Sequence, residues 1–169
     1  VALGTGCGGP LVSDPASVPQ RYESRGVDPY NLENARPRRS PVGLGDDVPN
    51  LLLMDQNGVE VGTYELVSGG DAVLIFSPGH ASPQARPIYD WVRRYRTMIS
   101  QRGAEVVILS PDPVETNARV AEDEQLRVAV LYDVSGWGAR SFGLIPRPEG
   151  DSVARPWTVV AGRDGRVMK

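Results

Sequence analysis

The stretch that most constrains this chain is residues 72–86, where a short apolar run is followed by a turn and then by a helical pattern. Ala72–Phe76 is apolar at every position, which is typical of a strand covered on both faces by helices. Ser77-Pro78-Gly79 breaks the run, and Pro87 suits the first turn of a helix. The free amides of a helix N-terminus favour negative charge, so the pattern predicts a functional loop at residues 77–86.

Short apolar runs alternate with helical patterns through the rest of residues 44–169. We expect a hairpin of strands 51–54 and 59–62, joined by the Asn57-Gly58 turn, and a short helix at 64–68. Further strands are expected at 105–110, 127–132, 156–161 and 166–168, and helices at 87–102, 111–125 and 133–142. Such alternation predicts an α/β domain with a mixed central sheet flanked by helices.

The helix expected at residues 87–102 has two faces. Its apolar stripe is formed by Ile88, Trp91, Val92, Tyr95, Met98 and Ile99, at three- and four-residue spacing. Its other side carries Arg93, Arg94, Arg96 and Arg102. This basic face fits either a solvated helix surface or a docking patch.

Residues 1–43 differ in composition from the rest of the chain. They are rich in Gly, Pro and Arg, and no stretch shows a sustained helical or strand period. We expect an irregular, extended N-terminal arm that lies on its own domain or on a partner. The side chains that we expect to anchor it or to bind a partner are Tyr22, Tyr30, Leu32, Arg36, Arg38 and Arg39.

Charge and composition exclude several functions. The net charge of −3 gives no electrostatic support for nucleic-acid binding. A single Cys and a single His exclude a metal site built mainly from those ligands and any disulfide within the chain. No apolar stretch approaches the ~20 residues of a membrane-spanning helix. We therefore expect no cofactor, no metal and no transmembrane segment.

Several motifs resemble those of the peroxiredoxins, the alkyl hydroperoxide reductase/thiol-specific antioxidant family. The family's loop signature is P-x-x-x-[T/S]-x-x-C; Pro78 and Ser82 fit it, and Ala85 stands at the cysteine. Residues 106–113, the helix pattern at 133–143 and the stretch 155–165 are also similar to family segments. The resemblance implies a thioredoxin-like fold over roughly residues 42–169.

The mechanism of the family needs a cysteine, and this chain has Ala85 at the matching position. In the family, a cysteine thiolate attacks the peroxide, while a Ser/Thr hydroxyl and an Arg hold it. The methyl group of Ala85 cannot attack anything, and Cys7 lies far outside the domain. We therefore expect a vestigial pocket of Pro78, His80, Ser82, Ala85, Arg86, Arg155 and Pro156. Arg155 or Arg86 would supply the cation, and Pro156 stands where thioredoxin-like folds place a cis proline. His80 fits either a general base or a loop histidine bonded to backbone.

Three functions follow from these features. The first is a non-catalytic subunit or binding module that docks onto a larger protein assembly through its arm. A membrane-attached bioenergetic complex, organellar or at the periphery of the cell envelope, would suit such a subunit. The alternative is a thiol peroxidase seen as an inactive Cys-to-Ala variant at Ala85. A third is a cofactor-independent enzyme that reuses Ser82, His80 and Arg155. Trp157 and Gly162, which replace the family's small and acidic residues, favour natural loss of the cysteine over an engineered change.

Overall fold

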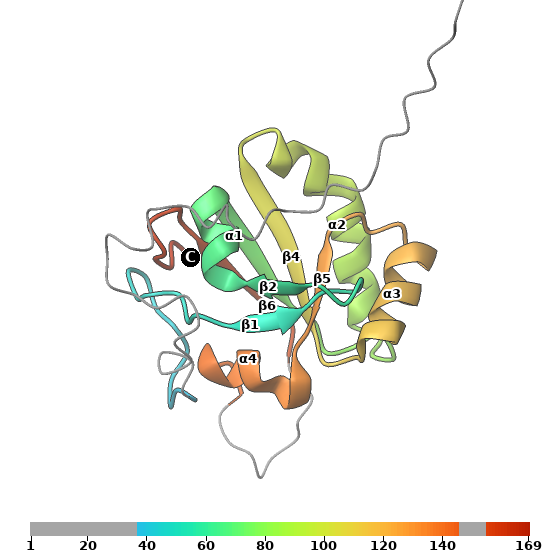
Figure 1. Cartoon of the computed structure of the whole chain (residues 1–169), viewed down its shortest axis with the longest axis horizontal. Coiled ribbons are helices and arrows are strands. Elements are labelled where there is room, and N and C mark those ends of the chain that lie inside the picture. Colours follow the sequence, from blue (N-terminus) through green and yellow to red (C-terminus); the bar gives the residue numbers. More distant parts are fainter. Residues whose placement is uncertain (1–36, 146–154) are drawn as a thin grey trace, which may run out of the picture.

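The computed structural model of this 169-residue chain describes residues 37–145 and 155–169. They form a six-stranded sheet with helices on both faces (Figure 1), in the strand order β2-β1-β5-β4-β3-β6. The strands are β1 (Leu52–Met54), β2 (Glu60–Gly62), β3 (Asp71–Phe76), β4 (Ala104–Ser110), β5 (Ala129–Tyr132) and β6 (Trp157–Ala161). The predicted α/β class with a mixed sheet is confirmed.

Strand direction decides where the functional loops gather. β3, β4 and β5 are parallel, whereas β6 runs antiparallel to β3 and pairs Trp157 with Phe76. The carboxyl ends of the three parallel strands therefore meet the amino end of β6 at one edge of the sheet. That edge is where open α/β sheets bind their ligands.

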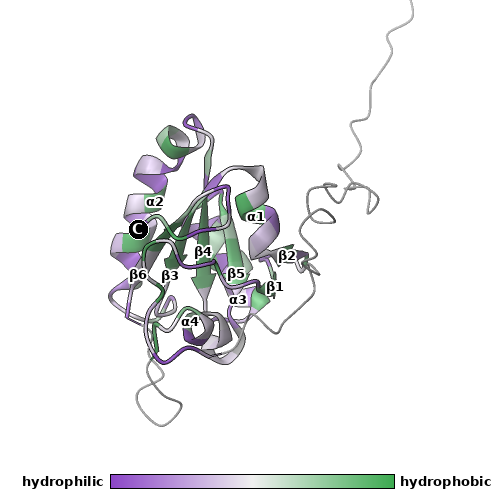
Figure 2. Ribbon diagram, turned by 90° about the vertical axis from the view of Figure 1, so that its left-hand side faces the viewer, coloured by the Kyte–Doolittle hydropathy of each residue, from purple (hydrophilic) through white to green (hydrophobic). Residues whose placement is uncertain are grey.

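The helices divide between the two faces of the sheet. They are α1 (Thr63–Gly69), α2 (Ala85–Ser100), α3 (Val114–Asp123) and α4 (Trp137–Ser141), the last preceded by a 3-10 turn at Val134–Gly136. α2 and α3 cover one face, and α1 and α4 cover the other (Figure 1). Apolar colour is concentrated on the central strands in Figure 2, because both of their faces are buried in core clusters.

α2 is rotated relative to the expected apolar stripe. Ala85, Tyr89 and Val92 are its buried residues, while Trp91 and Met98 are 38% and 43% exposed. The Trp91 and Tyr95 rings instead contact each other, with centroids 5.4 Å apart. The predicted stripe therefore includes residues of two faces, because three- and four-residue spacings alone fit more than one row along a helix.

The described end of the expected arm packs against α4. Arg38 N–H donates to Arg140 O at 3.0 Å, and Val42 N–H donates to Phe142 O at 3.0 Å. The Arg38 guanidinium also pairs with Asp46 at 2.7 Å, whereas Arg39 is exposed. Residues 37–43 thus contact the domain of their own chain. Cys7, Tyr22, Tyr30, Leu32 and Arg36 lie outside the described residues.

The structure confirms the predicted hairpin but not the full length of the predicted last strand. The hairpin is confirmed: Leu53 pairs antiparallel with Val61, and the turn places Gly58 at φ 75°. The expected last strand at 166–168 is reduced to isolated bridges, Asp47 to Arg166 and Ala161 to Val167.

Within residues 37–145 and 155–169, every helix falls short of the length and apolarity that a membrane crossing requires.

Candidate functional site

The loop between β3 and α2 lies at the carboxyl edge of the sheet. Ser77 N–H donates to Leu109 O at 2.8 Å, so the pairing of β3 with β4 continues into the loop. Gly79 then turns the chain at φ 94°, and a Cβ there would lie 3.2 Å from the Asp112 carboxylate. Only glycine adopts this conformation without strain and also leaves room for Asp112.

Ala85 occupies the position that the family pattern gives to cysteine. It is the first residue of α2, and its N–H donates to Ser82 O at 3.0 Å. Its side chain is 0% exposed and belongs to the core cluster that includes Ile75, Tyr89 and Val106. The position that the motif predicts for the nucleophile therefore carries a methyl group that is part of the packed core.

His80 and Asp112 form the polar centre of this edge. Asp112 Oδ2 accepts a hydrogen bond from the His80 backbone N–H at 2.7 Å and lies 3.3 Å from His80 Nδ1. The Ser110 hydroxyl donates to the same oxygen at 3.1 Å. The His80 ring thus contacts a carboxylate and not the backbone partner that is usual for a loop histidine. This contact leaves Nε2 as the ring nitrogen that can meet a ligand.

Sequence reasoning missed Asp112 as a member of the site. It lies in the Ser-Pro-Asp-Pro turn after β4, where the sequence predicts the start of a helix and resembles a family segment. The available signal was its place directly after a strand that neighbours β3 in a parallel sheet. Carboxyl ends of adjacent parallel strands meet, so Asp112 was a candidate for contact with the 77–84 loop.

Tyr89 lies beneath this polar pair and is buried. Burial raises the pKa of its phenol to about 12, and the nearby negative charge of Asp112 adds to the increase. A hydrogen bond with Ser77 acts in the opposite direction. Tyr89 is therefore a neutral hydroxyl under ordinary conditions and is not an acid or base for catalysis near neutral pH.

The remaining predicted pocket residues lie at or near the surface of this edge. Ser82 is half-buried, and its Oγ accepts a hydrogen bond from Gln84 N–H at 3.3 Å. Arg86 and Arg155 are exposed, and neither forms an ion pair within the described part of the chain. The pairing of β6 with β3 brings residues 155–156 to the same edge as the loop.

The peptide bond before Pro156 differs from the cis bond that thioredoxin-like folds have at this position. No peptide bond among the described residues is cis, so the Arg155–Pro156 bond is trans. Pro156 is exposed and precedes β6 directly.

A shallow apolar groove of about 400 Å³ lies beside the loop, between the start of α2 and β6. Its walls include Ile75, Pro87, Ile88, Trp91, Pro156 and Thr158. Of the predicted pocket residues, only Pro156 lines it.

Among residues 37–145 and 155–169, no group of three or more His, Cys, Asp or Glu side chains is arranged to hold a metal ion. The edge thus offers an imidazole, a hydroxyl and an apolar surface.

Comparison with known proteins agrees with this architecture. Residues 44–169 match the model of the AhpC/TSA family. A curated Mycobacterium tuberculosis (strain H37Rv) protein whose name places it among the peroxiredoxins, Rv1608c, is 31% identical over 100 residues. That match covers 59% of this chain and 65% of the relative, slightly under two thirds of the relative's length.

Solved structures show the same fold. The crystal structure of peroxidoxin BcpB from Mycobacterium tuberculosis has a TM-score of 0.69 and 28% identity, over 75% of this chain and 82% of that one. A thiol peroxidase from Chromobacterium violaceum has a TM-score of 0.66 at 15% identity, over 79% and 78% of the two chains, and supports the fold alone. The predicted thioredoxin-like fold is confirmed. Because the family model matches most of the chain, this protein belongs to the AhpC/TSA family.

Proposed function

We propose that this chain is a non-catalytic member of the AhpC/TSA family, a binding module that docks onto a larger protein assembly. The family's chemistry depends on a thiolate at the start of α2, and this chain has Ala85 there. In this role the domain presents a binding surface to its partner and does not reduce peroxide.

The observation that carries the proposal is the environment of Ala85. A thiolate nucleophile must be reached by its substrate, whereas the Ala85 methyl group is 0% exposed and packs among apolar neighbours. Neither of the two candidate cations, Arg86 and Arg155, forms an ion pair in the described part of the chain. The loop is instead fixed by the contact of His80 with Asp112, which needs no cysteine.

The path of residues 37–43 supports docking through the arm. This segment is hydrogen-bonded to α4, so the residues that precede it start from a fixed point on the domain. Arg38 already pairs with Asp46, which leaves Arg36 and Arg39 as the cations proposed for a partner. A segment that orders on binding covers much surface for its length. We propose Tyr22, Tyr30 and Leu32 as its apolar contacts.

The catalytic part of the proposal is tested by peroxide consumption with a thiol reductant. Three proteins are compared in a Cys7→Ser background: the otherwise unchanged chain, Ala85→Cys, and Ala81→Cys as a matched control in the exposed part of the same loop. We expect no turnover from the unchanged chain and none above the Ala81→Cys level from Ala85→Cys.

The alternative is a thiol peroxidase whose nucleophile has been replaced at Ala85; two of the relatives carry peroxiredoxin or peroxidoxin names. In that case Ala85→Cys alone gains turnover at rates typical of peroxiredoxins, because the surrounding groups still hold and polarise the peroxide. The chain with Ala85 and Cys7 both unchanged is assayed as a fourth protein. Turnover by it that Cys7→Ser removes would contradict both functions, since Cys7 would then be the nucleophile.

Docking is tested by affinity purification from the native cell with identification of bound proteins. The full chain is compared with a chain lacking residues 1–36 and with Ala85→Cys, which keeps the arm. We expect the same partner with the full chain and with Ala85→Cys, and loss of that partner without residues 1–36. Retention of the partner by the truncated chain would show that the folded domain carries the interaction.

A further inference from the structure

β6 forms one edge of the sheet, and part of its outer side has no strand beside it. Residues 166–169 cover that side as far as Val160, where Met168 N–H donates to Val160 O at 2.7 Å. Because the backbone groups of alternate residues in a strand point the same way, the N–H and C=O of Thr158 also face outward. Within the described part of the chain, no residue outside the β3–β6 pairing bonds to them. The edge from Pro156 to Thr158 is therefore open to a further strand.

The open edge adjoins the apolar groove of about 400 Å³ between β6 and the start of α2. Pro156 and Thr158 line this groove on the β6 side, and Ile88 and Trp91 line it on the α2 side. Thr158 pairs with Ile75, which belongs to the core cluster under α2, so the Thr158 side chain is on the same face of the sheet. A strand added here would place every second side chain in the groove. Free backbone groups beside a pocket are what proteins use to bind extended peptides by strand addition.

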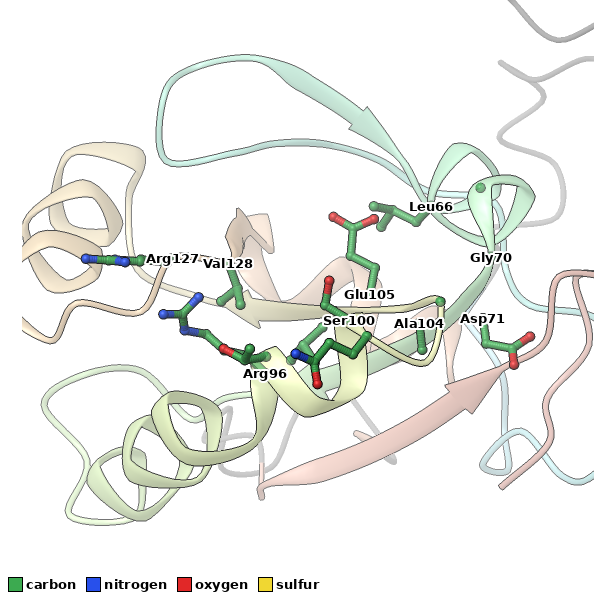
Figure 3. A pocket seen from close by; sticks show the side chains of 14 residues that line it. Leu66, Gly70, Asp71, Arg96, Ser100, Ala104, Glu105, Arg127 and Val128 are labelled. Atoms are coloured by element: carbon green, nitrogen blue, oxygen red, sulfur yellow. The ribbon is translucent and has the colours of Figure 1, made fainter.

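A larger cavity, of about 600 Å³, lies at the other end of the sheet and lacks such a match. Figure 3 shows it at the starts of β3 and β4 and beside the last turns of α2. Arg96 and Glu105 lie on opposite faces of the sheet with β4 between them. The Arg127 guanidinium, at the rim, is exposed and directed away from the cavity. These charged groups therefore do not converge on one ligand.

Residues 29–33 of the arm, Pro-Tyr-Asn-Leu-Glu, have a pattern that fits the open edge of β6. Tyr30 and Leu32 alternate with polar residues, as in a strand with one apolar face. In an antiparallel pairing with Tyr30 opposite Thr158 and Leu32 opposite Pro156, both apolar side chains would face the groove. Tyr30 and Thr158 could then exchange both backbone hydrogen bonds, and Leu32 N–H could donate to Pro156 O.

The two ends of this segment suit the same register. The nitrogen of Pro29 would point away from β6, so its missing N–H would leave no β6 carbonyl without a partner. Glu33 would lie opposite Arg155, which is exposed and forms no ion pair within residues 37–145 and 155–169. Opposite charges on directly facing residues stabilise a strand pair. Apolar and charged side chains thus specify one register together.

The described end of the arm lies close to the start of β6. Residues 37–43 run along α4, and the Phe142 ring directly after α4 contacts the Phe76 ring, with centroids 5.0 Å apart. Phe76 in turn pairs with Trp157, the first residue of β6. Residues 33–36 join the segment to the described chain, and an extended connection of that length spans about 17 Å. This reach suits a segment that passes from α4 to the open edge.

We propose that residues 29–33 of the arm bind the open edge of β6 as an added antiparallel strand, with Tyr30 and Leu32 in the groove beside Trp91. The added strand belongs to the chain free of partners and does not rest on the function proposed above. A partner that takes Tyr30 and Leu32 has to release them from β6 first. The groove and the partner therefore compete for the same side chains.

Hydrogen exchange at the Thr158 amide tests the added strand. In ¹H–¹⁵N spectra of the isolated protein, this amide should exchange about tenfold more slowly in the full chain than in a chain that lacks residues 1–36. Leu32→Asp should return the rate to that of the truncated chain, because a carboxylate is unfavourable in an apolar groove. Asn31→Asp is the matched control: it adds the same charge on the other face of the strand and should keep the protection.

A disulfide trap tests the register. Asn31 would lie opposite Trp157 in a pair without backbone hydrogen bonds, where Cα atoms are about 4.5 Å apart and a disulfide can form. In a Cys7→Ser background, Asn31→Cys with Trp157→Cys should form an intrachain bond under mild oxidation at low protein concentration. Asn31→Cys with Met54→Cys, at an exposed position of β1, is the control and should not.

Four results would overturn the proposal. They are equal exchange at Thr158 in the full and truncated chains, an equal loss of protection in Asn31→Asp, equal disulfide yields from the two cysteine pairs, or cross-links that form only between chains. The last result would assign the edge to the arm of a second copy. Substitutions at positions 31 and 32 leave residues 37–169 unchanged, so the exchange test remains valid if Trp157→Cys is unstable.

Discussion

Asp112 is the residue on which the two loops at the carboxyl edge converge. Its Oδ2 atom accepts from the His80 N–H and from the Ser110 hydroxyl, and its backbone O accepts from Asn117 Nδ2 at 2.8 Å. The Asp112 side chain therefore links the β3–α2 loop to β4, and its backbone carbonyl adds a link to α3. Its role in this chain is to hold the loop in place, whatever the residue at position 85 does.

We expect Asp112→Asn to lower the free energy of unfolding by about 1–3 kcal/mol, because the amide cannot accept as many hydrogen bonds and carries no charge. Urea unfolding of the two proteins measures this difference. Asp123→Asn, at an exposed position in α3, is the control and should change stability by less than about 0.5 kcal/mol. Equal losses in both variants would refute the assigned role of Asp112.

Tyr89 gives a prediction about alkaline pH. Its pKa in the folded state is about 12, against 10.0 for a free phenol. Because the folded pKa is raised, the stabilisation is fully present below pH 10 and is lost as the pH rises from 10 toward 12. Near-ultraviolet absorbance should show one tyrosine that ionises near pH 12, and Tyr89→Phe should remove that step. Asp112→Asn should lower its pKa. An unchanged titration curve in Tyr89→Phe would contradict the assignment.

At the scale of elements, α4 depends on a buried carboxylate at its start. Asp133 accepts from Gly138 N–H at 2.5 Å and from Ala139 N–H at 3.0 Å. Burial raises its pKa, and these two hydrogen bonds and Arg140 oppose that increase without cancelling it. The ionised form is therefore less favourable in the fold than in water.

The raised pKa of Asp133 determines how its contribution to the free energy of unfolding changes with pH. The stabilisation due to Asp133 is present below its ordinary pKa of 3.8 and is lost as the pH rises through its higher folded pKa. We expect the wild type to lose stability relative to Asp133→Asn as the pH rises from about 4 to about 7. Urea unfolding at both pH values measures the difference between the proteins. A gap that is constant with pH, or that changes in the opposite direction, would be inconsistent with a raised pKa.

The contact of residues 37–43 with α4 depends on a glycine. Gly143 has φ 70°, and a Cβ there would lie 2.0 Å from Ser40 O. We expect Gly143→Ala to displace residues 38–42 and to lower stability by about 1 kcal/mol or more, from strain and lost hydrogen bonds. Hydrogen exchange at the Val42 amide, which bonds to Phe142 O, should become faster.

Gly69→Ala is the matched control for this prediction. Gly69 ends α1, and a Cβ there meets no atom within 4 Å. In Gly69→Ala, hydrogen exchange at the Val42 amide should be as slow as in the wild type. Protection of Val42 that is the same in both alanine variants would mean that the segment tolerates the clash by a local adjustment.

At the scale of the whole molecule, residues 37–43 belong to the folded unit although their composition resembles the preceding arm. We expect a chain that lacks residues 1–43 to be less stable than one that lacks residues 1–36. The backbone hydrogen bonds of Arg38 and Val42 to α4 are lost only in the shorter chain, at about 0.5–1.5 kcal/mol each. Thermal unfolding compares the two. Identical midpoints would place the boundary of the fold at residue 43.

The two ends of the sheet have different chemistry. At the carboxyl edge, His80 contacts Asp112, and Ala85, where the family motif predicts the nucleophile, is part of the core. At the opposite end, Arg96 and Arg127 have no ion-pair partner in the described part of the chain.

The sequence by itself determined what local pattern encodes. Apolar runs and turn residues located the hairpin, the parallel strands and α2 to within a few residues, because strand and helix periods are properties of consecutive residues. The motif around Pro78, Ser82 and Ala85 indicated the family, and it predicts that the nucleophile is missing.

Only the tertiary structure decided which distant residues meet. His80 and Asp112 are 32 positions apart, and their contact requires β3 and β4 to be parallel neighbours. Arg96 and Arg127 share a cavity because α2 and the start of β5 reach the same end of the sheet. Periodicity does not specify strand order or the rotation of a helix about its axis. Those depend on how the apolar faces pack together, which is a property of the whole chain.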